Sequence, residues 1–429
     1  MKFKIAIVID HPQRDLQGLM YLAEKLVKRG QKVFIVQFYE INFFLLKYSK
    51  DIDLIIFNFF RKSNLDTIIA AKYINKKVII YDQEGASGYD GISIKNNFLK
   101  LKKNIQLVDG FLFWGIRQKK SCKNILKKFR IPSEVMGCLR FESLKKNIPK
   151  KLYKKFILVN TNFTFFPKFE QNSDKELHNA TETGLIKKSE KKMVLNESIF
   201  RRDGLLKFVI KLSKHYPKKN IILRPHPFEN NFFWKKNLKK YKNVKVKSGG
   251  TSIDMIKNSS HIFHIDCSTS VESYILNKKS YSLFYLIKNH KYFYKPVNSF
   301  CRKIHSEKKA IGLINDQEQK YQKLVLKKDF FFNLHKKNNL MTAINFIDKI
   351  CKKKNKKKLN IKLKFTKKII TLYYIKKVLG VRLYDYLMSI IKGYEYIKIR
   401  KIKEIQKKDI KLNSNFTVNK LDRSIFLIT

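Results

Sequence analysis

The sequence has few glycines and prolines and no long uncharged apolar run. Its 429 residues include only 15 Gly and 8 Pro, too few for a linker-rich or fibrous protein. Hydrophobic residues make up 44% of the chain and aromatic residues 13%, too many for intrinsic disorder. The chain is therefore expected to be globular, and it is long enough for two domains with full hydrophobic cores.

The five cysteines show neither metal-ligand nor disulfide spacing. They are Cys122, Cys138, Cys267, Cys301 and Cys351. Because they form no CxxC pair, the sequence indicates neither a zinc site nor a disulfide framework, and a reducing cytoplasm is the expected location. His261 and His264 lie on a predicted strand at a spacing that places them on opposite faces. We therefore expect no metal site, and no other cofactor is indicated.

Membrane-spanning and secretion signals are not expected. The first residues, MKFKIAIVIDHPQ, contain a short apolar run that is broken by Asp10 and His11. This pattern predicts a first strand rather than a signal peptide. The most apolar windows fall short of the roughly 18 uncharged residues that a membrane span requires.

Acidic residues are scarce: 34 Asp and Glu stand against 93 Lys and Arg, which gives a formal net charge of +59. Such an excess suggests nucleic-acid binding through counterion release. However, the lysines are spread through every segment, as a bias towards AT-rich codons would produce, and no RNA-binding or helix-turn-helix signature accompanies them. We expect no specific nucleic-acid partner, but a surface that favours nucleotide-sugars and the acidic face of a membrane.

Strand and helix patterns alternate along the first 150 residues. Residues 3–9 and 33–38 are predicted strands on either side of a helix that ends near Gly30. This unit predicts a parallel sheet with right-handed crossovers. Further strands are predicted at residues 53–57, 77–81, 110–114 and 133–139.

A second series of strands and helices starts at residue 156. Predicted strands at 156–160, 221–223, 244–246 and 261–265 alternate with helices, including an amphipathic helix over residues 205–216. The expected fold is therefore α/β, with two Rossmann-like doubly wound domains at residues 1–150 and 151–345 and a cleft between them. A basic, mostly helical extension over residues 346–429 would follow, and its interleaved basic and apolar residues would allow peripheral contact with an anionic membrane.

One predicted strand, Ile221 to Leu223, ends abruptly in Arg224, Pro225, His226 and Pro227. The prolines cannot continue a strand ladder. They hold His226 in a stiff loop at the carboxyl end of the strand, where open α/β sheets bind their ligands. Arg224 offers a planar fork for phosphate or carboxylate. The simpler interpretation is a strand end with a solvated turn.

Two later loops in this half carry small and hydroxyl side chains. In DCSTSVES, Ser268, Thr269 and Ser270 precede or begin a helix, where backbone N–H groups hold a phosphate well; ordinary helix capping is the alternative. In the other loop, SGGTS, Gly249 and Gly250 would let a base or ribose approach the backbone closely, or would simply form a turn.

Acidic residues follow two predicted strands in the first half. Asp82, Glu84 and Gly85 come directly after the strand at residues 77–81, and a carboxylate there could act as a general base towards an acceptor hydroxyl. The alternative is a turn with solvated acids. Asp10 and His11 end the first strand and would line the same cleft on the acceptor side; helix capping is the alternative for Asp10.

The motifs RPHPFE, DCSTSVES, DQEG and FLFWGIRQ together resemble the bacterial surface-carbohydrate biosynthesis proteins, which are similar to two-domain glycosyltransferases of the GT-B fold. The His-Pro and Ser/Thr motifs also resemble those of bacterial sialyltransferases and Kdo transferases, which use CMP-activated sugars. The resemblance covers about residues 1–345. It implies a metal-independent, inverting glycosyltransferase of surface polysaccharide or lipopolysaccharide biosynthesis, located in the cytoplasm or at the inner face of the membrane. Its partners would be a nucleotide-sugar donor and a glycan or lipid-linked acceptor.

The resemblance also implies roles for individual residues. His226 would contact the donor phosphate, together with the hydroxyls of the Ser/Thr loop. In those transferases an acidic pair followed by glycine carries the base. Here Gln83 replaces the first acid, so the base would be Glu84, beside Gly85, or else Asp82.

Three alternatives to a sugar transferase remain open. A polyol-phosphate transferase of the teichoic-acid type also combines a His-Pro with a Ser-rich loop, and it would need His11 as a second catalytic histidine. A nucleotide-sugar epimerase would use one substrate and no acceptor. A non-catalytic basic protein would bind nucleic acid or anionic lipid through its surface charge.

Overall fold

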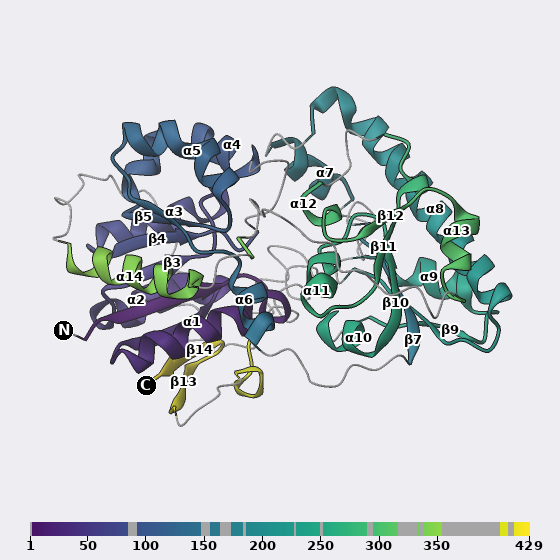
Figure 1. The fold of residues 1–429 in the computed structure, drawn as a ribbon. Helices are drawn as coiled ribbons and strands as arrows, with labels where there is room; N and C mark the ends of the chain where they lie inside the picture. The colour runs from purple at the N-terminus through teal and green to yellow at the C-terminus, as the bar shows by residue number, and fades with distance from the viewer. Residues whose placement is uncertain are drawn as a thin grey trace, which may run out of the picture. The chain divides into compact units, whose positions relative to one another are not determined.

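The computed structural model of the protein describes residues 2–84, 92–146, 155–163, 173–182, 186–226, 229–248, 252–289, 295–315, 333–334, 338–353, 404–410 and 416–429. The chain divides into two compact units, which Figure 1 shows as ribbons. Unit 1 contains Met1–Ser143 and Lys328–Thr429, and unit 2 contains Leu144–Lys327. The first division lies near the predicted boundary at residue 150, whereas the C-terminal residues belong to unit 1.

Unit 1 is built around an eight-stranded sheet with the order β13-β14-β2-β1-β3-β4-β5-β6. Its strands are β1 (Lys4–Ile9), β2 (Lys32–Gln37), β3 (Leu54–Phe57), β4 (Lys77–Tyr81), β5 (Gly110–Phe113), β6 (Ser133–Val135), β13 (Val418–Asp422) and β14 (Ile425–Ile428). The strands from β2 to β6 are parallel. Apart from the polar edge strand β6, they are almost continuously apolar, as expected where helices cover both faces of a sheet.

The helices of unit 1 bury their apolar faces against this sheet. They are α1 (Gln17–Lys28), α2 (Ile41–Tyr48), α3 (Lys62–Tyr73), α4 (Ile92–Lys100), α5 (Ile116–Lys128), α14 (Asn339–Lys352) and α6 (Leu139–Lys146), whose last three residues are assigned to unit 2, with short helical turns η1 (Pro12–Leu16), η2 (Phe38–Glu40), η3 (Ser49–Asp51), η5 (Lys102–Leu107) and η10 (Lys407–Asp409). The core is rich in aromatic side chains: the rings of Phe98 and Phe111 lie 4.5 Å apart, and both lie beside Phe60.

The C-terminal residues form a β-hairpin that the sequence analysis did not anticipate. Strand β14 pairs antiparallel with β2, with Phe426 opposite Ile35, and β13 pairs with β14. Ser424, in the turn, has a positive φ of 52°. The hairpin covers what would otherwise be the exposed edge of β2. In the described part of the predicted helical extension, the last residues are therefore strands.

Unit 2 contains a fully parallel sheet with the order β12-β11-β10-β7-β8-β9. Its strands are β7 (Phe156–Asn160), β8 (Ile221–Arg224), β9 (Val244–Val246), β10 (Ser259–His264), β11 (Ser280–Leu283) and β12 (Arg302–Ile304). Its helices are α7 (Ser173–Glu182), α8 (Lys191–His215), α9 (Asn231–Leu238), α10 (Ser252–Asn258), α11 (Thr269–Ile275), α12 (Lys295–Asn298) and α13 (Glu307–Gly312), with turns η7 (Lys188–Glu190) and η8 (Phe284–Leu286).

The long helix α8 supplies much of the core of unit 2. Leu205, Phe208 and Leu212 are fully buried and recur at the spacing of one helix face. The helix starts at Lys191, well before the predicted start at residue 205. The prediction missed its first turns because they lack a clear apolar stripe.

Gly18 of α1 provides a test of how tightly unit 1 is packed. A Cβ at this position would lie 2.5 Å from the backbone N of Arg140 and 2.7 Å from the backbone C of Leu139. Because backbone atoms of α6 cannot move aside as a side chain can, Gly18→Ala is expected to cost roughly 3 kcal/mol. Urea unfolding measures this loss. Gly312→Ala is the control, since nothing lies within 4 Å of its Cβ. Equal unfolding midpoints for the two variants would contradict the close packing.

Candidate functional site

Polar side chains of unit 1 gather at the carboxyl ends of three neighbouring strands. Asp10 follows β1, Arg61 lies four residues after β3, and Asp82 and Glu84 follow β4. Since these strands are parallel and adjacent, their loops meet at one edge of the sheet. The structure therefore brings the predicted residues Asp10, Asp82 and Glu84 together in one cluster.

Two arginines hold this cluster together. Arg14, in turn η1, donates through Nε and Nη2 to Asp15 at 2.8 Å each, and through Nη2 to Asp10 at 3.1 Å. Its Nη1 donates to Oε1 of Glu84 at 3.2 Å, and Nη1 of Arg61 donates to Oε2 of Glu84 at 2.7 Å. Arg61 also lies 3.5 Å from Asp82. Each carboxylate oxygen of Glu84 thus accepts from a different guanidinium group.

The same contacts separate the proton affinities of the two acids. Burial by itself would raise the pKa of Glu84, but the charges of Arg61 and Arg14 outweigh it and hold this pKa well below its usual range. Burial raises the pKa of Asp82, an effect that the charge of Arg61 only partly offsets and the charge of Glu84 reinforces. A carboxylate with a raised pKa is the stronger base, so Asp82 has the higher proton affinity of the two acids, although the sequence analysis placed the base first at Glu84.

Gln83 has a structural role that explains why it is not an acid. Its side chain is buried and turns back to β1, where Oε1 accepts from the backbone N–H of Asp10 at 2.9 Å and Nε2 donates to the carbonyl of Val8 at 2.6 Å. Its own N–H donates to the carbonyl of Asn58 at 2.8 Å. A neutral amide both donates and accepts here without a change of protonation state, so Gln83 joins β1, β3 and β4.

Gln83→Glu tests this assignment. The new carboxyl group would face the Val8 carbonyl and would have to be protonated to donate, so its pKa in the folded state would lie above the unfolded value. We expect a loss of roughly 2 kcal/mol at neutral pH that shrinks as the pH falls towards about 4. Urea unfolding across this pH range measures it. Gln17→Glu, at an exposed position of α1, should show no such loss, and a pH-independent result for Gln83→Glu would contradict the assignment.

In unit 2, the loop that carries His226 is fixed by the buried carboxylate of Glu229. Its Oε1 accepts from Thr161 Oγ1 at 2.5 Å, from the N–H of Phe163 at 2.7 Å and from the N–H of His226 at 3.4 Å, and its Oε2 accepts from Trp234 Nε1 at 2.8 Å. The N–H of His226 also donates to Thr161 Oγ1 at 3.1 Å. Glu229 and His226, on either side of residues 227–228, are therefore both hydrogen-bonded to residues at the end of β7.

The Ser/Thr loop after β10 has only one accessible hydroxyl. Ser268 is exposed, whereas Thr269 accepts from Asn160 Nδ2 at 3.0 Å and the fully buried Ser270 donates to the carbonyl of Val297 at 2.6 Å. The hydroxyls of Thr269 and Ser270 thus make structural contacts. Of the three predicted donor-binding hydroxyls, Ser268 remains the candidate for direct contact with a ligand.

A buried ion pair holds the start of this loop. Asp266 accepts from Arg201 Nη1 at 2.8 Å and from Asn298 Nδ2 at 2.5 Å, and Arg201 also donates through Nε to Glu197 at 2.8 Å. Sequence analysis missed both Arg201 and Glu229. Arg201 could have been noticed as an arginine within the buried stripe of α8, and Glu229 as an acid three residues after His226.

The remaining predicted site residues make few contacts in the structure or lie outside its described part. Arg224 ends β8 and is partly buried, and His11 is buried with its N–H donating to Asp15 at 3.2 Å. Gly85, Pro227, Gly249 and Gly250 lie outside the described residues. In the described part of the chain no group of three His, Cys, Asp or Glu could hold a metal ion, and no helix is long and apolar enough to cross a bilayer.

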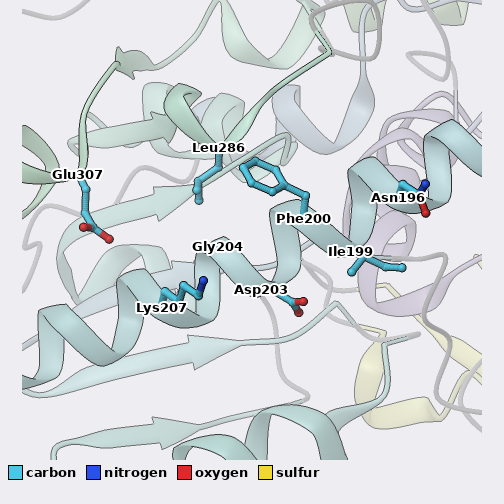
Figure 2. Close-up of a pocket in the computed structure, with 8 residues that line it drawn as sticks. All are labelled: Asn196, Ile199, Phe200, Asp203, Gly204, Lys207, Leu286 and Glu307. Atoms are coloured by element: carbon cyan, nitrogen blue, oxygen red, sulfur yellow. The ribbon is translucent and has the colours of Figure 1, made fainter.

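A hollow of about 560 Å³ in unit 2 includes none of these residues. It is lined by Asn196, Ile199, Phe200, Asp203, Gly204 and Lys207 of α8, with Leu286 of η8 and Glu307 of α13. Figure 2 shows these side chains along α8 and the facing turn. The lining mixes apolar groups with charges of both signs, so it does not indicate a particular ligand.

Comparisons with solved structures identify the type of fold. No protein-family model and no curated protein matches the chain. Among solved structures, a UDP-N-acetylglucosamine 2-epimerase superposes with a TM-score of 0.53 at 10% identity, covering 84% of this chain and 100% of the epimerase. A putative UDP-N-acetylglucosamine 2-epimerase from Listeria monocytogenes gives a TM-score of 0.52 at 10% identity over the same shares. The fold is GT-B-like.

The prediction of two Rossmann-like α/β domains is thereby confirmed. A third similar structure, S. aureus MnaA with UDP, has a TM-score of 0.50 at 12% identity and covers 81% of this chain and 96% of MnaA. Of the first two structures, one is described as a UDP-N-acetylglucosamine 2-epimerase and the other as a putative one, and the comparisons do not support the resemblance to CMP-sugar transferases. At these identities the likeness concerns the fold.

Proposed function

We propose that this chain is an enzyme that acts on a UDP-sugar, and that its first candidate reaction is inversion of carbon 2 of a UDP-N-acetylhexosamine. The observation that carries the proposal is the likeness in fold, over 84% of the chain, to two proteins described as UDP-N-acetylglucosamine 2-epimerases. The reaction itself is argued from the chemistry of the clusters in the two units.

Asp82 is the proposed proton-transfer group. Inversion at a carbon atom requires that a proton is removed and that a proton is returned on the opposite face. The electron pair left at carbon 2 would form a double bond to carbon 1 as the bond from carbon 1 to UDP breaks, and re-addition of UDP with a proton delivered by a second donor to the opposite face would complete the inversion. For the first step, a carboxylate with a raised pKa is a better base than a strongly acidic one. Asp82 has this property, whereas Glu84, paired with Arg14 and Arg61, would position the arginines and set the local charge.

Unit 2 is the proposed nucleotide-binding unit. His226 and Arg224 stand at the carboxyl end of β8, and Ser268 is exposed at the carboxyl end of β10. Imidazole, guanidinium and hydroxyl groups are suitable donors to a diphosphate. The carboxyl ends of parallel strands are also the usual place for nucleotides in doubly wound sheets.

Glycosyl transfer is the second candidate, and the His226 loop favours it. The N–H of His226 donates to Thr161 and Glu229, and the sequence RPHPFE resembles the His-Pro motif of transferases. In that reaction Asp82 would accept the proton of an acceptor hydroxyl, and His226 would stabilise the leaving nucleotide.

One assay separates the two candidates. The purified chain is incubated with UDP-N-acetylglucosamine in deuterium oxide without any acceptor. An epimerase forms the 2-epimer and incorporates deuterium at carbon 2, which NMR detects. A transferase leaves the sugar unchanged and releases UDP only when a glycan acceptor is added. Neither reaction, together with no rise in melting temperature at saturating UDP, would refute the proposal.

A further inference from the structure

We infer that the outer face of α4 and α5 in unit 1 is a docking surface for an anionic lipid bilayer. The surface, called the α4–α5 face, consists of Lys95, Leu99, Lys102 and Lys103 on α4 and the start of η5, and Lys120, Lys123 and Lys127 on α5. All seven side chains are exposed. This inference does not depend on which reaction the enzyme performs.

The two helices present these side chains on one side of the sheet. They follow β4 and β5 in a run of parallel strands with successive right-handed crossovers, which places both on the same face of the sheet, and they lie next to each other (Figure 1). Their opposite sides, with Phe98 on α4 and Leu126 on α5, are buried in one hydrophobic core. The exposed lysines therefore face away from that core together.

Few acidic side chains neutralise this face. Between residues 92 and 133 the one acidic residue is Asp109, which is engaged by Lys72 at 2.8 Å and by the N–H of Val78 at 2.8 Å. Just beyond, Glu134 lies 3.5 Å from Lys119. Along the sequence the lysines are evenly spread, so this face could not be recognised from their positions in the chain. Neither α4 nor α5 contains an acidic residue, whereas the acids Asp10, Asp82 and Glu84 of unit 1 lie at the ends of strands.

An exposed leucine points to lipid rather than nucleic acid. Leu99 is 48% exposed and shares one side of α4 with Lys95, four residues earlier. In an anionic interface the leucine enters the acyl boundary while lysine stems lie along it and their ammonium groups meet the headgroups. Nucleic acid would gain little from Leu99, and the face has no aromatic side chain on which a base could stack.

The test uses the full chain and vesicles of phosphatidylcholine with about 30% phosphatidylglycerol, a charge density at which each lysine near the surface contributes about 1 kcal/mol. The variant Lys95→Gln, Lys102→Gln, Lys120→Gln, Lys123→Gln removes four charges from the face. The matched control, Lys235→Gln, Lys236→Gln, Lys239→Gln, Lys240→Gln, removes four exposed charges from α9 and the following turn in unit 2. Melting temperatures confirm that each variant is folded.

We expect the α4–α5 variant to lose roughly 500- to 1,000-fold in vesicle partitioning and the control to change by less than about threefold. Leu99→Gln, which leaves the charge unchanged, should lose about fivefold to tenfold. The inference is overturned if the wild type does not bind these vesicles, if both four-residue variants lose equally, or if Leu99→Gln binds normally. It is also overturned if duplex DNA binds the same face and displaces the vesicles at equal salt.

Discussion

Replacement of Asp82 by asparagine is expected to lower turnover of the UDP-sugar by about 10²–10⁴-fold while the fold is retained. Asparagine keeps the shape of the side chain, and its Oδ1 can still accept from the N–H of Glu84, a bond of 2.9 Å in the structure. What it removes is the group that takes up a proton. Steady-state kinetics with UDP-N-acetylglucosamine measure the loss.

The comparison with Glu84→Gln makes the Asp82 prediction specific. Since Arg61 and Arg14 hold the pKa of Glu84 well below its usual range, that carboxylate is a weak base, and its neutralisation should reduce turnover less than Asp82→Asn does. A larger loss in Glu84→Gln would return the base to Glu84 and contradict the assignment to Asp82.

The pH dependence supplies an independent readout for Asp82. Because burial raises its pKa in the folded protein, activity should fall on the acid side at a pH above the ordinary range of a carboxyl group, and Asp82→Asn should abolish this limb. Activity therefore rises as Asp82 loses its proton, whereas the contribution of Asp82 to stability falls. The folded protein holds this proton more tightly than the unfolded chain does, so the wild type loses stability relative to Asp82→Asn as the pH rises through that window.

Replacement of Glu229 by glutamine is expected to destabilise unit 2 by about 2–3 kcal/mol. The carboxylate accepts from four donors, three at Oε1 and one at Oε2. Glutamine has a single acceptor oxygen, and its NH₂ group would face a donor whichever way it is oriented. The loop of His226 would lose its attachment to β7, so the KM for the UDP-sugar should rise along with the loss of stability.

Trp234 reports this change directly because its indole N–H donates to Glu229 at 2.8 Å. Urea unfolding followed by tryptophan fluorescence in a Trp114→Phe background isolates the signal of unit 2. Glu307→Gln serves as the control, since Glu307 forms a surface ion pair with Lys211 of the kind that contributes less than about 1 kcal/mol. Similar small losses in both variants would show that Glu229 does not hold the loop.

Local patterns in the sequence determined the strand-and-helix alternation and where polar loops interrupt it. Buried strands such as Ile221–Leu223 are recognisable because each is a short apolar run closed by residues that cannot extend a ladder. Parallel strands end at a common edge, so the sequence also placed Asp82 and Glu84 near Asp10, and His226 at the end of its strand. These conclusions required only properties of neighbouring residues.

Only the tertiary structure decided how the residues at these edges divide their roles. Arg14 and Arg61 reach Glu84 from distant positions in the chain, and this pairing makes Glu84 the weaker base. The side chain of Gln83 is hydrogen-bonded to β1, the hydroxyl of Ser270 donates to the carbonyl of Val297, and the C-terminal hairpin pairs with β2. The physical reason is the same in each case: burial, charge and hydrogen-bond partners are set by residues brought together from far along the chain, which no local pattern records.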